Sequence, residues 1–218
     1  MRWTFIVASA VAVLVGFTVT PRTAGAEPLK FTPDDVVRWE RRNFKAATDY
    51  RVVTDEARGR PVLRASASGT ASGLFRKVRI DLDQTPYLSF SWNVSDVYPG
   101  IDERTKAGDD FPARVYVVIE RGIGGFRSLS LNYVWSNSGA PGDLWPSPYT
   151  SQVKLLALDA GLARTGRWIS DKRNVKADLR RAFGEEITSI DAIAIMTDAD
   201  NFGGRTVTLY GDLSFSAE

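Results

Sequence analysis

The sequence predicts an all-β chain: an antiparallel β-sandwich of jelly-roll type with one late helix. Apolar and polar residues alternate with a period of two over many short segments, and clusters rich in Gly and Asp separate these segments. Only one long segment, late in the chain, shows helical periodicity. About ten short strands with a single late helix are typical of a two-layer sandwich.

The N-terminal residues 1–26 have the features of a secretory signal peptide. Arg2 precedes an apolar run, 5–19, and the small residues 24–26 form a cleavage site. We expect cleavage after Ala26, a periplasmic or secreted location, and one domain over 27–218. An uncleaved N-terminal anchor is the alternative, although the run is shorter than the about 20 residues that span a bilayer. No later segment is long and apolar enough to cross a membrane.

The composition excludes several classes of function. The chain has 28 Lys+Arg and 26 Asp+Glu, and removal of Arg2 and Arg22 would leave 26 of each, so nothing favours a nucleic-acid partner. The chain has neither Cys nor His. A disulfide scaffold, a Ser-His-Asp triad and the usual zinc ligands are therefore absent. Chemistry would depend on carboxylates, Lys, Tyr or Ser, and a metal would be a hard, oxygen-bound ion.

A short helix is expected near the start, at 32–40, with Thr32 as its cap and Pro33 in its first turn. Strand alternation is clearest in residues 87–94, where Trp92 lies on the apolar face, and it recurs in 128–136, which carries Trp135. Both tryptophans are expected in the core. The other clear strands are 113–120 and 206–215, and weaker ones are predicted at 50–55, 61–67, 73–81, 151–158 and 187–197.

The late helix covers 174–185. Val175, Leu179 and Phe183 lie on one stripe, Asn174 is placed to cap the start, and Gly184 suits the end.

Four segments resemble a known family: "KAGDDFPARVYVV" (106–118), "LNYVW" (131–135), "RNVKADLRRAFGE" (173–185) and "IAIMTDADN…YGDLSF" (193–215). They are similar to the domain-of-unknown-function 3047 family of exported bacterial proteins, and the resemblance covers nearly all of the mature chain. It implies a galactose-binding-like jelly roll, as in many carbohydrate-binding modules. It implies no established activity.

The "GDDF" segment places Asp109 and Asp110 before the strand that carries Arg114. The two carboxylates could face a ligand or form a directional pair with Arg114. The alternative is a solvated turn held by one Asp.

The "TDADN" segment ends an apolar run with Asp198, Asp200 and Asn201. It fails as an EF-hand loop because Phe202 and Leu209 stand where oxygen ligands are needed. A structural calcium ion held from distant loops by Asp109, Asp110, Asp198 and Asp200 stays open, although no cofactor is certain. A catalytic carboxylate pair, a ligand-binding rim and a hydrogen-bonded strand end also stay open.

Aromatic and polar residues extend the candidate site. Trp145 and Tyr149 lie in a Pro-rich loop that no core pattern explains, where they would stack on a ligand, or Trp145 would be buried as a satellite cluster. Arg173 could pair with one of the Asp clusters. A polar set would line one groove if its strands were neighbours: Ser89, Ser91, Asn93, Tyr116, Asn132, Tyr210 and Asp212.

The leading hypothesis is an exported, non-catalytic module that binds a saccharide or cell-envelope glycan. The alternatives are a carboxylate-based glycan hydrolase or lyase, and a module that binds or assembles with an envelope protein. The candidate ligand-binding residues are Asp109, Asp110, Arg114, Tyr116, Asn132, Trp145, Tyr149, Arg173, Asp198, Asp200 and Asn201.

Overall fold

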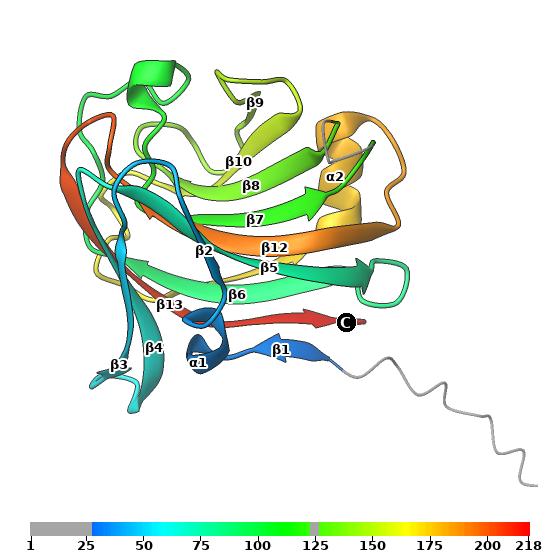
Figure 1. The fold of residues 1–218 in the computed structure, drawn as a ribbon, viewed down its shortest axis with the longest axis horizontal. Helices are drawn as coiled ribbons and strands as arrows, with labels where there is room; N and C mark the ends of the chain where they lie inside the picture. The colour runs from blue at the N-terminus through cyan, green and yellow to red at the C-terminus, as the bar shows by residue number, and fades with distance from the viewer. Residues whose placement is uncertain (1–27, 123–126) are drawn as a thin grey trace, which may run out of the picture.

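The computed structural model of the protein describes residues 28–122 and 127–218, and the expected signal peptide lies outside these residues. The described residues form two β-sheets that pack face to face, with a helix at one end of the sandwich (Figure 1). The predicted all-β sandwich with one late helix is confirmed. Within 28–122 and 127–218, no helix is long and apolar enough to span a membrane.

The six-stranded sheet has the order β11-β6-β13-β4-β3, and β1 also pairs with β13. Its strands are β1 (Leu29–Phe31), β3 (Asp49–Asp55), β4 (Arg60–Ser68), β6 (Tyr87–Val94), β11 (Ile169–Asn174) and β13 (Arg205–Ser216).

The seven-stranded sheet has the order β2-β5-β12-β7-β8-β10-β9. All its pairs are antiparallel except β8 with β10, which run parallel. Its strands are β2 (Glu40–Asn43), β5 (Ala71–Asp81), β7 (Arg114–Ile119), β8 (Leu129–Ser136), β9 (Leu144–Pro146), β10 (Val153–Ala160) and β12 (Ser189–Asp198).

Both helices begin at the predicted caps. Helix α1 (Pro33–Val36) starts after Thr32, whose side chain and Asp35 form a reciprocal capping box. Helix α2 (Val175–Phe183) starts after Asn174, which accepts the Ala177 N–H at 2.9 Å. It ends at Gly184, whose φ of 74° requires glycine because a side chain is strained there. A single 3₁₀ turn, η1 (Lys106–Gly108), lies between β6 and β7.

The core lies between the sheets and is rich in aromatic rings. Trp92 of β6 meets Trp135 of β8 edge-on across the sandwich, with ring centroids 6.1 Å apart. Phe90 and Tyr133 make a second contact between the sheets at 6.2 Å. Aromatic pairs at these distances contribute about 1 kcal/mol each beyond the burial of the rings. The expected core positions of Trp92 and Trp135 are confirmed, since both side chains are fully buried.

The expectation that one polar groove contains the whole predicted set is wrong. Strands β6 and β13 belong to one sheet, whereas β7 and β8 belong to the other, so Ser89 and Ser91 cannot share a face with Tyr116 and Asn132. Tyr210 is also misplaced. The pairing of β13 with β6 shifts register between Tyr210 and Leu213, and an extra residue reverses which side chains face inward. Tyr210 is therefore buried in the core, not exposed on a groove.

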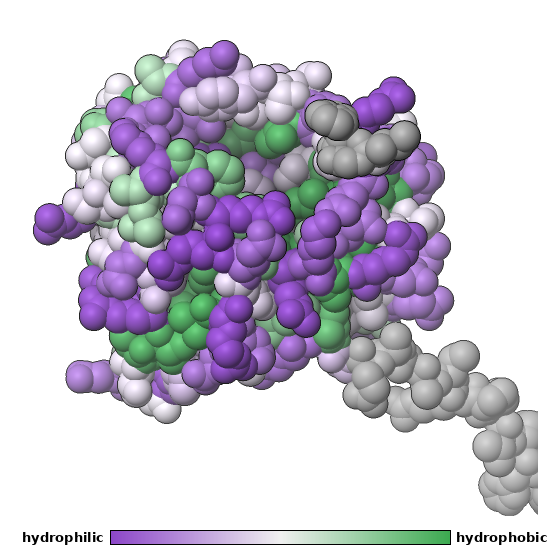
Figure 2. All heavy atoms as spheres, viewed as in Figure 1, coloured by the Kyte–Doolittle hydropathy of each residue, from purple (hydrophilic) through white to green (hydrophobic). Residues whose placement is uncertain are grey.

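Hydrophilic residues cover most of the side of the molecule seen in Figure 1, and hydrophobic residues show in a few patches (Figure 2). Four large hydrophobic side chains are well exposed among the described residues: Phe44, Tyr149, Leu162 and Phe202. Single exposed apolar residues are ordinary, so their position relative to a cavity decides whether they matter.

Candidate functional site

The outer face of the seven-stranded sheet carries the candidate site. Cross-strand pairing places a row of five residues across β5, β12, β7, β8 and β10, in the order Phe75, Ala194, Tyr116, Asn132 and Leu155. Residues that are directly opposite one another lie on the same face of a sheet. Their sequence neighbours Val115, Val117, Leu131 and Tyr133 point into the core, so this row lies on the outer face.

The next row on this face carries the charged groups. Gly73, Met196 and Arg114 are paired across β5, β12 and β7, and Asp198 follows opposite Ala71. A Cβ atom on Gly73 would lie 2.7 Å from the Phe75 ring and 3.0 Å from the Ile195 carbonyl oxygen. Glycine at position 73 therefore leaves room for the Phe75 ring, and the small residue Ala71 lines the cavity.

A cavity of about 450 Å³ lies over these rows. Its lining includes eight of the predicted residues: Asp109, Arg114, Tyr116, Asn132, Tyr149, Asp198, Asp200 and Asn201. The other lining residues are Phe44, Ala71, Ser147, Val153, Leu155 and Met196. Residues from four loops and five strands that are far apart in the sequence thus meet in one hollow, as ligand sites typically do.

An ion pair between Arg114 and Asp198 forms the base of the cavity. Arg114 Nε donates to Asp198 Oδ1 at 3.0 Å, and Arg114 Nη2 donates to Asp198 Oδ2, so the pair is a bidentate fork. Arg114 Nη2 also donates to the Asp109 carbonyl oxygen at 2.6 Å. Both side chains are buried. Asp198 raises the pKa of Arg114 well above its usual range, against the opposing effect of burial, so the guanidinium is always charged.

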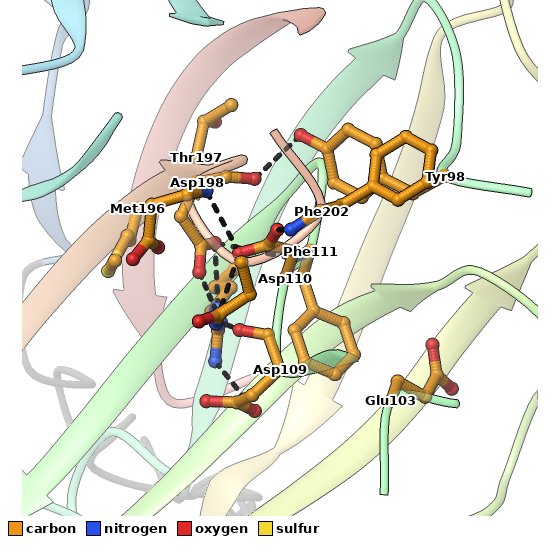
Figure 3. A network of polar contacts seen from close by, with 12 residues as sticks. Tyr98, Glu103, Asp109, Asp110, Phe111, Met196, Thr197, Asp198 and Phe202 are labelled. Atoms are coloured by element: carbon orange, nitrogen blue, oxygen red, sulfur yellow. Dashed lines mark hydrogen bonds and ion pairs between the residues drawn. The ribbon is translucent and has the colours of Figure 1, made fainter. Parts of the chain in front are cut away.

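Asp110 lies behind the cavity and ties the two Asp segments together (Figure 3). Its Oδ1 accepts the Asp200 N–H at 3.1 Å, and its Oδ2 accepts the Phe202 N–H at 2.6 Å. The Asn201 amide donates to the same carboxylate at 3.4 Å. The side chain is fully buried. Asp110 therefore holds the loop between β12 and β13, and does not face the ligand space.

Two carboxylates that face the cavity, Asp109 and Asp200, are only partly neutralised by neighbouring cations and hydrogen-bond donors. Asp109 lies 3.6 Å from Arg114 Nη1, and its Oδ1 is buried with no hydrogen-bond partner in the described residues. Burial raises the pKa of Asp109, and the Asp110 charge raises it further, while Arg114 opposes both. Burial and Asp110 likewise raise the pKa of Asp200.

Three carboxylates converge closely enough to suggest a cation: Asp110, Asp198 and Asp200 each offer an oxygen within 4.8 Å of the others. The hydrogen bonds that these carboxylates already accept leave few oxygens free for a calcium ion. Both oxygens of Asp198 accept from Arg114, and both oxygens of Asp110 accept main-chain N–H groups. Calcium takes six to eight oxygen ligands, and this cluster leaves the carboxylate of Asp200 as the main free group. The Arg114 guanidinium already supplies a positive charge where the sequence suggested an ion.

Two exposed aromatic side chains flank the cavity. Phe44 is 65% exposed and follows β2, and Tyr149 is 56% exposed and lies between β9 and β10. The Tyr149 hydroxyl donates to the Lys106 carbonyl oxygen at 3.3 Å, and Lys106 Nζ lies 5.3 Å from the ring centroid. These contacts hold the Tyr149 ring in place although most of it is exposed.

Trp145 is not exposed, so its expected stacking role is wrong. The alternative, burial in a satellite cluster, is confirmed. It is 3% exposed and packs with Phe111, Val134, Leu155 and Ala157 in a small cluster of its own. Its position in β9, opposite Leu155, supports the Tyr149 loop from beneath.

Arg173 lies outside the site. Its guanidinium makes a fork to Asp178 of α2, with distances of 2.9 and 2.6 Å, and Asp178 also accepts the Tyr133 hydroxyl at 3.0 Å. The expected pairing with an Asp cluster of the site is therefore wrong. Arg173 fastens α2 to the sandwich.

Sequence reasoning missed Phe44, Met196 and Glu103. Phe44 had a signal, since it is an aromatic residue in the charged segment "ERRNFK". Met196 had none, because it continues the apolar run of β12. Glu103 is 3% exposed and accepts the Asn137 N–H at 2.7 Å, while Asn137 Nδ2 donates to the Asp110 carbonyl oxygen at 2.8 Å. Glu103 therefore supports the "GDDF" loop from behind.

Comparison with solved structures shows the fold. The family 30 carbohydrate-binding module of the cellulosomal cellulase Cel9D-Cel44B of Clostridium thermocellum superposes with a TM-score of 0.51 at 13% identity, covering 88% of this chain and 98% of that one. A cellulase derived from Cel12A of Rhodothermus marinus gives a TM-score of 0.43 at 8% identity, with 86% and 100% covered.

The glycoside hydrolase domain of Endo-D from Streptococcus pneumoniae R6 gives a TM-score of 0.41 at 12% identity. The superposition covers 83% of this chain but only 22% of that one. At such identities the likeness concerns the fold alone.

A search of curated proteins gave no match. The model of one protein family matches residues 37–214, which include every lining residue of the cavity. The chain therefore belongs to the family described as protein of unknown function DUF3047.

Proposed function

We propose that this protein is an exported, non-catalytic module that binds a saccharide in the cavity on the outer face of the seven-stranded sheet. One observation carries the proposal: two exposed aromatic rings, Phe44 and Tyr149, flank a cavity whose base is made of buried polar groups. The rings offer apolar contact area, and the base offers directional hydrogen bonds.

The chemistry of the cavity suits a polyhydroxylated ligand. A sugar ring has apolar C–H faces that pack on aromatic rings and hydroxyl groups that need both donors and acceptors. Asn132 is 2% exposed; its Oδ1 accepts the Ser130 hydroxyl at 2.8 Å, and its Nδ2 donates to no partner in the described residues. Asp109 Oδ1 is an acceptor without a donor. A donor and an acceptor are thus available to ligand hydroxyls at the base of one cavity.

The test is affinity electrophoresis and calorimetry of the mature chain with a panel of soluble β-glucans, xylans and envelope glycans. A binding glycan should lose about tenfold in affinity when Tyr149→Ala or Phe44→Ala removes a ring. Tyr87→Ala is the matched control, because Tyr87 also carries a lysine over its ring, Lys172 at 5.0 Å, but belongs to the other sheet. Equal affinity in the Tyr149, Phe44 and Tyr87 variants would contradict the proposed site.

A carboxylate-based hydrolase or lyase is the second candidate, and Asp109 is the observation that favours it. Its carboxyl lines the cavity, and burial raises its pKa in the direction a general acid needs. Asp198 is a poorer choice because its oxygens are held by Arg114. If the protein is an enzyme, Asp109→Asn should abolish release of reducing ends from a bound glycan while binding persists.

The proposal also assigns the protein to the periplasm or the extracellular space. The N-terminal "MRWTFIVASAVAVLVG" and the small residues before Glu27 support export. Mass spectrometry of the protein recovered outside the cytoplasm should then give a chain that begins at Glu27. A chain that still carries residues 1–26 would support the uncleaved anchor.

A further inference from the structure

The charges that line the cavity are unbalanced. Three carboxylates, Asp109, Asp198 and Asp200, face one guanidinium, Arg114, and the buried carboxylate of Asp110 lies directly behind them. Two cations lie nearby: Lys45 Nζ donates to the Asp200 carbonyl oxygen at 3.0 Å and offsets part of the Asp200 charge, and Lys106 lies over the Tyr149 ring. The cavity therefore carries an excess of negative charge.

Arg114 cannot balance all three carboxylates. Its Nε and Nη2 are directed at Asp198 and at the Asp109 carbonyl oxygen, and Nη1 lies 3.6 Å from Asp109 Oδ1, beyond hydrogen-bond distance. Asp109 Oδ1 stays buried without a partner. Such an oxygen costs free energy unless a donor reaches it. A sugar hydroxyl would satisfy its hydrogen bond, and a cation would also relieve the repulsion among the carboxylates.

On the basis of the proposed saccharide site, we propose that its ligand is a glycan with a free amino group, an unacetylated amino sugar whose ammonium lies between Asp109 and Asp200. An ammonium has three donors and a compact charge, which suits two carboxylates that line one cavity and are close enough for their charges to interact. The flanking rings of Phe44 and Tyr149 then pack on the sugar faces. The same negative charge would repel uronic acids and phosphorylated glycans.

The experiment compares three β-1,4-linked oligomers of equal length, built from glucosamine, N-acetylglucosamine or glucose, by calorimetry below the pKa of the amine. They differ only in the group on the second carbon. The glucosamine oligomer should bind about tenfold more tightly than the other two. Its advantage should shrink at high salt and above the pKa of the amine, because both changes weaken the charge interaction.

Asp200→Asn should remove most of this advantage and leave the affinity for the glucose oligomer nearly unchanged. Asp34→Asn is the matched control: it makes the same change in net charge at an exposed position in α1, outside the cavity. Asp109→Asn is a second variant, and thermal unfolding checks that each variant is folded.

Equal binding of the three oligomers, all lost in Tyr149→Ala, would overturn the inference and leave the proposed saccharide site intact. The inference would also be overturned if Asp34→Asn reduced the advantage of the glucosamine oligomer as much as Asp200→Asn does. The attraction would then be non-specific. Displacement of the glucosamine oligomer by micromolar Ca²⁺ would assign the carboxylates to a metal instead. Absence of binding by all three would overturn the inference, and the wider glycan panel would then decide on the saccharide site.

Discussion

Asp171 is a half-buried acidic residue with one carboxylate oxygen that has no hydrogen-bond partner in the described residues. It lies in β11, and its Oδ2 is buried and accepts no hydrogen bond in the described residues. The neighbouring arginines are directed elsewhere, since Arg164 pairs with Asp159 at 2.8 Å and Arg173 pairs with Asp178. Burial, together with the Asp159 charge, raises the pKa of Asp171 to about 6. Asp198 differs in having a cation, Arg114, beside it, and burial raises the pKa of Asp198 as well.

The raised pKa of Asp171 predicts a pH-dependent loss of stability. The folded pKa of about 6 lies above the 3.8 of an unperturbed aspartate, so the folded chain binds more protons than the unfolded chain between these values. This group therefore stabilises the fold most below pH 4, and its contribution is lost as the pH rises through 6. Asp171→Asn should raise the free energy of unfolding by about 1–2 kcal/mol above pH 7 and change it little near pH 4.

Urea unfolding of Asp171→Asn and of the parent chain, near pH 4 and above pH 7, measures this difference. Asp34→Asn is the control at an exposed position. The same difference between variant and parent at both pH values would show that Asp171 is already ionised in the fold.

At the scale of elements, the site depends on loops that are fastened to one another as well as to strands. The loop that follows β12 is held by Asp110, which comes from the loop before β7. The Tyr98 hydroxyl donates to the Asp198 carbonyl oxygen at 2.6 Å, and the Tyr98 N–H donates to Asn137 Oδ1 at 2.8 Å. Three connections thus share one buried polar network beside the cavity.

Asp110→Ala should release the loop between β12 and β13 more than it weakens the sheets. It removes charge-assisted bonds to the N–H groups of Asp200 and Phe202, which should cost about 2–3 kcal/mol. Hydrogen exchange at these two amides should become faster, while the amides of Val115 and Val117 in β7 follow only the change in global stability.

Asp143→Ala is the control for this experiment. Its carboxylate accepts the Ala140 N–H at 3.1 Å in an exposed loop outside the cavity lining. Faster exchange at residues 200 and 202 in both variants, or in neither, would show that Asp110 does not hold this loop.

At the scale of the whole molecule, local patterns predicted the strands but could not assign them to sheets. Strand β6 has the bounds that period-two alternation predicts, because each of its faces is uniformly apolar or polar. Strand β2 was missed because all four of its residues are exposed and three are charged, so it has no apolar face. β1 and β9 were missed because they have three residues each.

The site was predictable where acidic residues end an apolar strand, as at Asp198 and Asp200. It was not predictable where a contact depends on topology, since nothing local pairs Arg114 with Asp198 or places Phe44 and Tyr149 on one cavity. The register shift in β13 also has no local signal, and it reversed the predicted orientation of Tyr210.

Calcium and glycan should affect the stability of the whole mature chain differently. Any ligand that binds only the folded state stabilises it, by about 2.7 kcal/mol at 100 times its Kd, which raises the Tm of a domain of this size by several degrees. EDTA and millimolar Ca²⁺ should leave the Tm unchanged, because Arg114 and main-chain N–H groups already occupy the oxygens of Asp198 and Asp110. An amino-sugar oligomer should raise it, and Tyr149→Ala should lose that rise. If Ca²⁺ instead raises the Tm in the parent chain but not in Asp110→Ala, the carboxylate cluster is an ion site, and its excess negative charge is explained without a glycan.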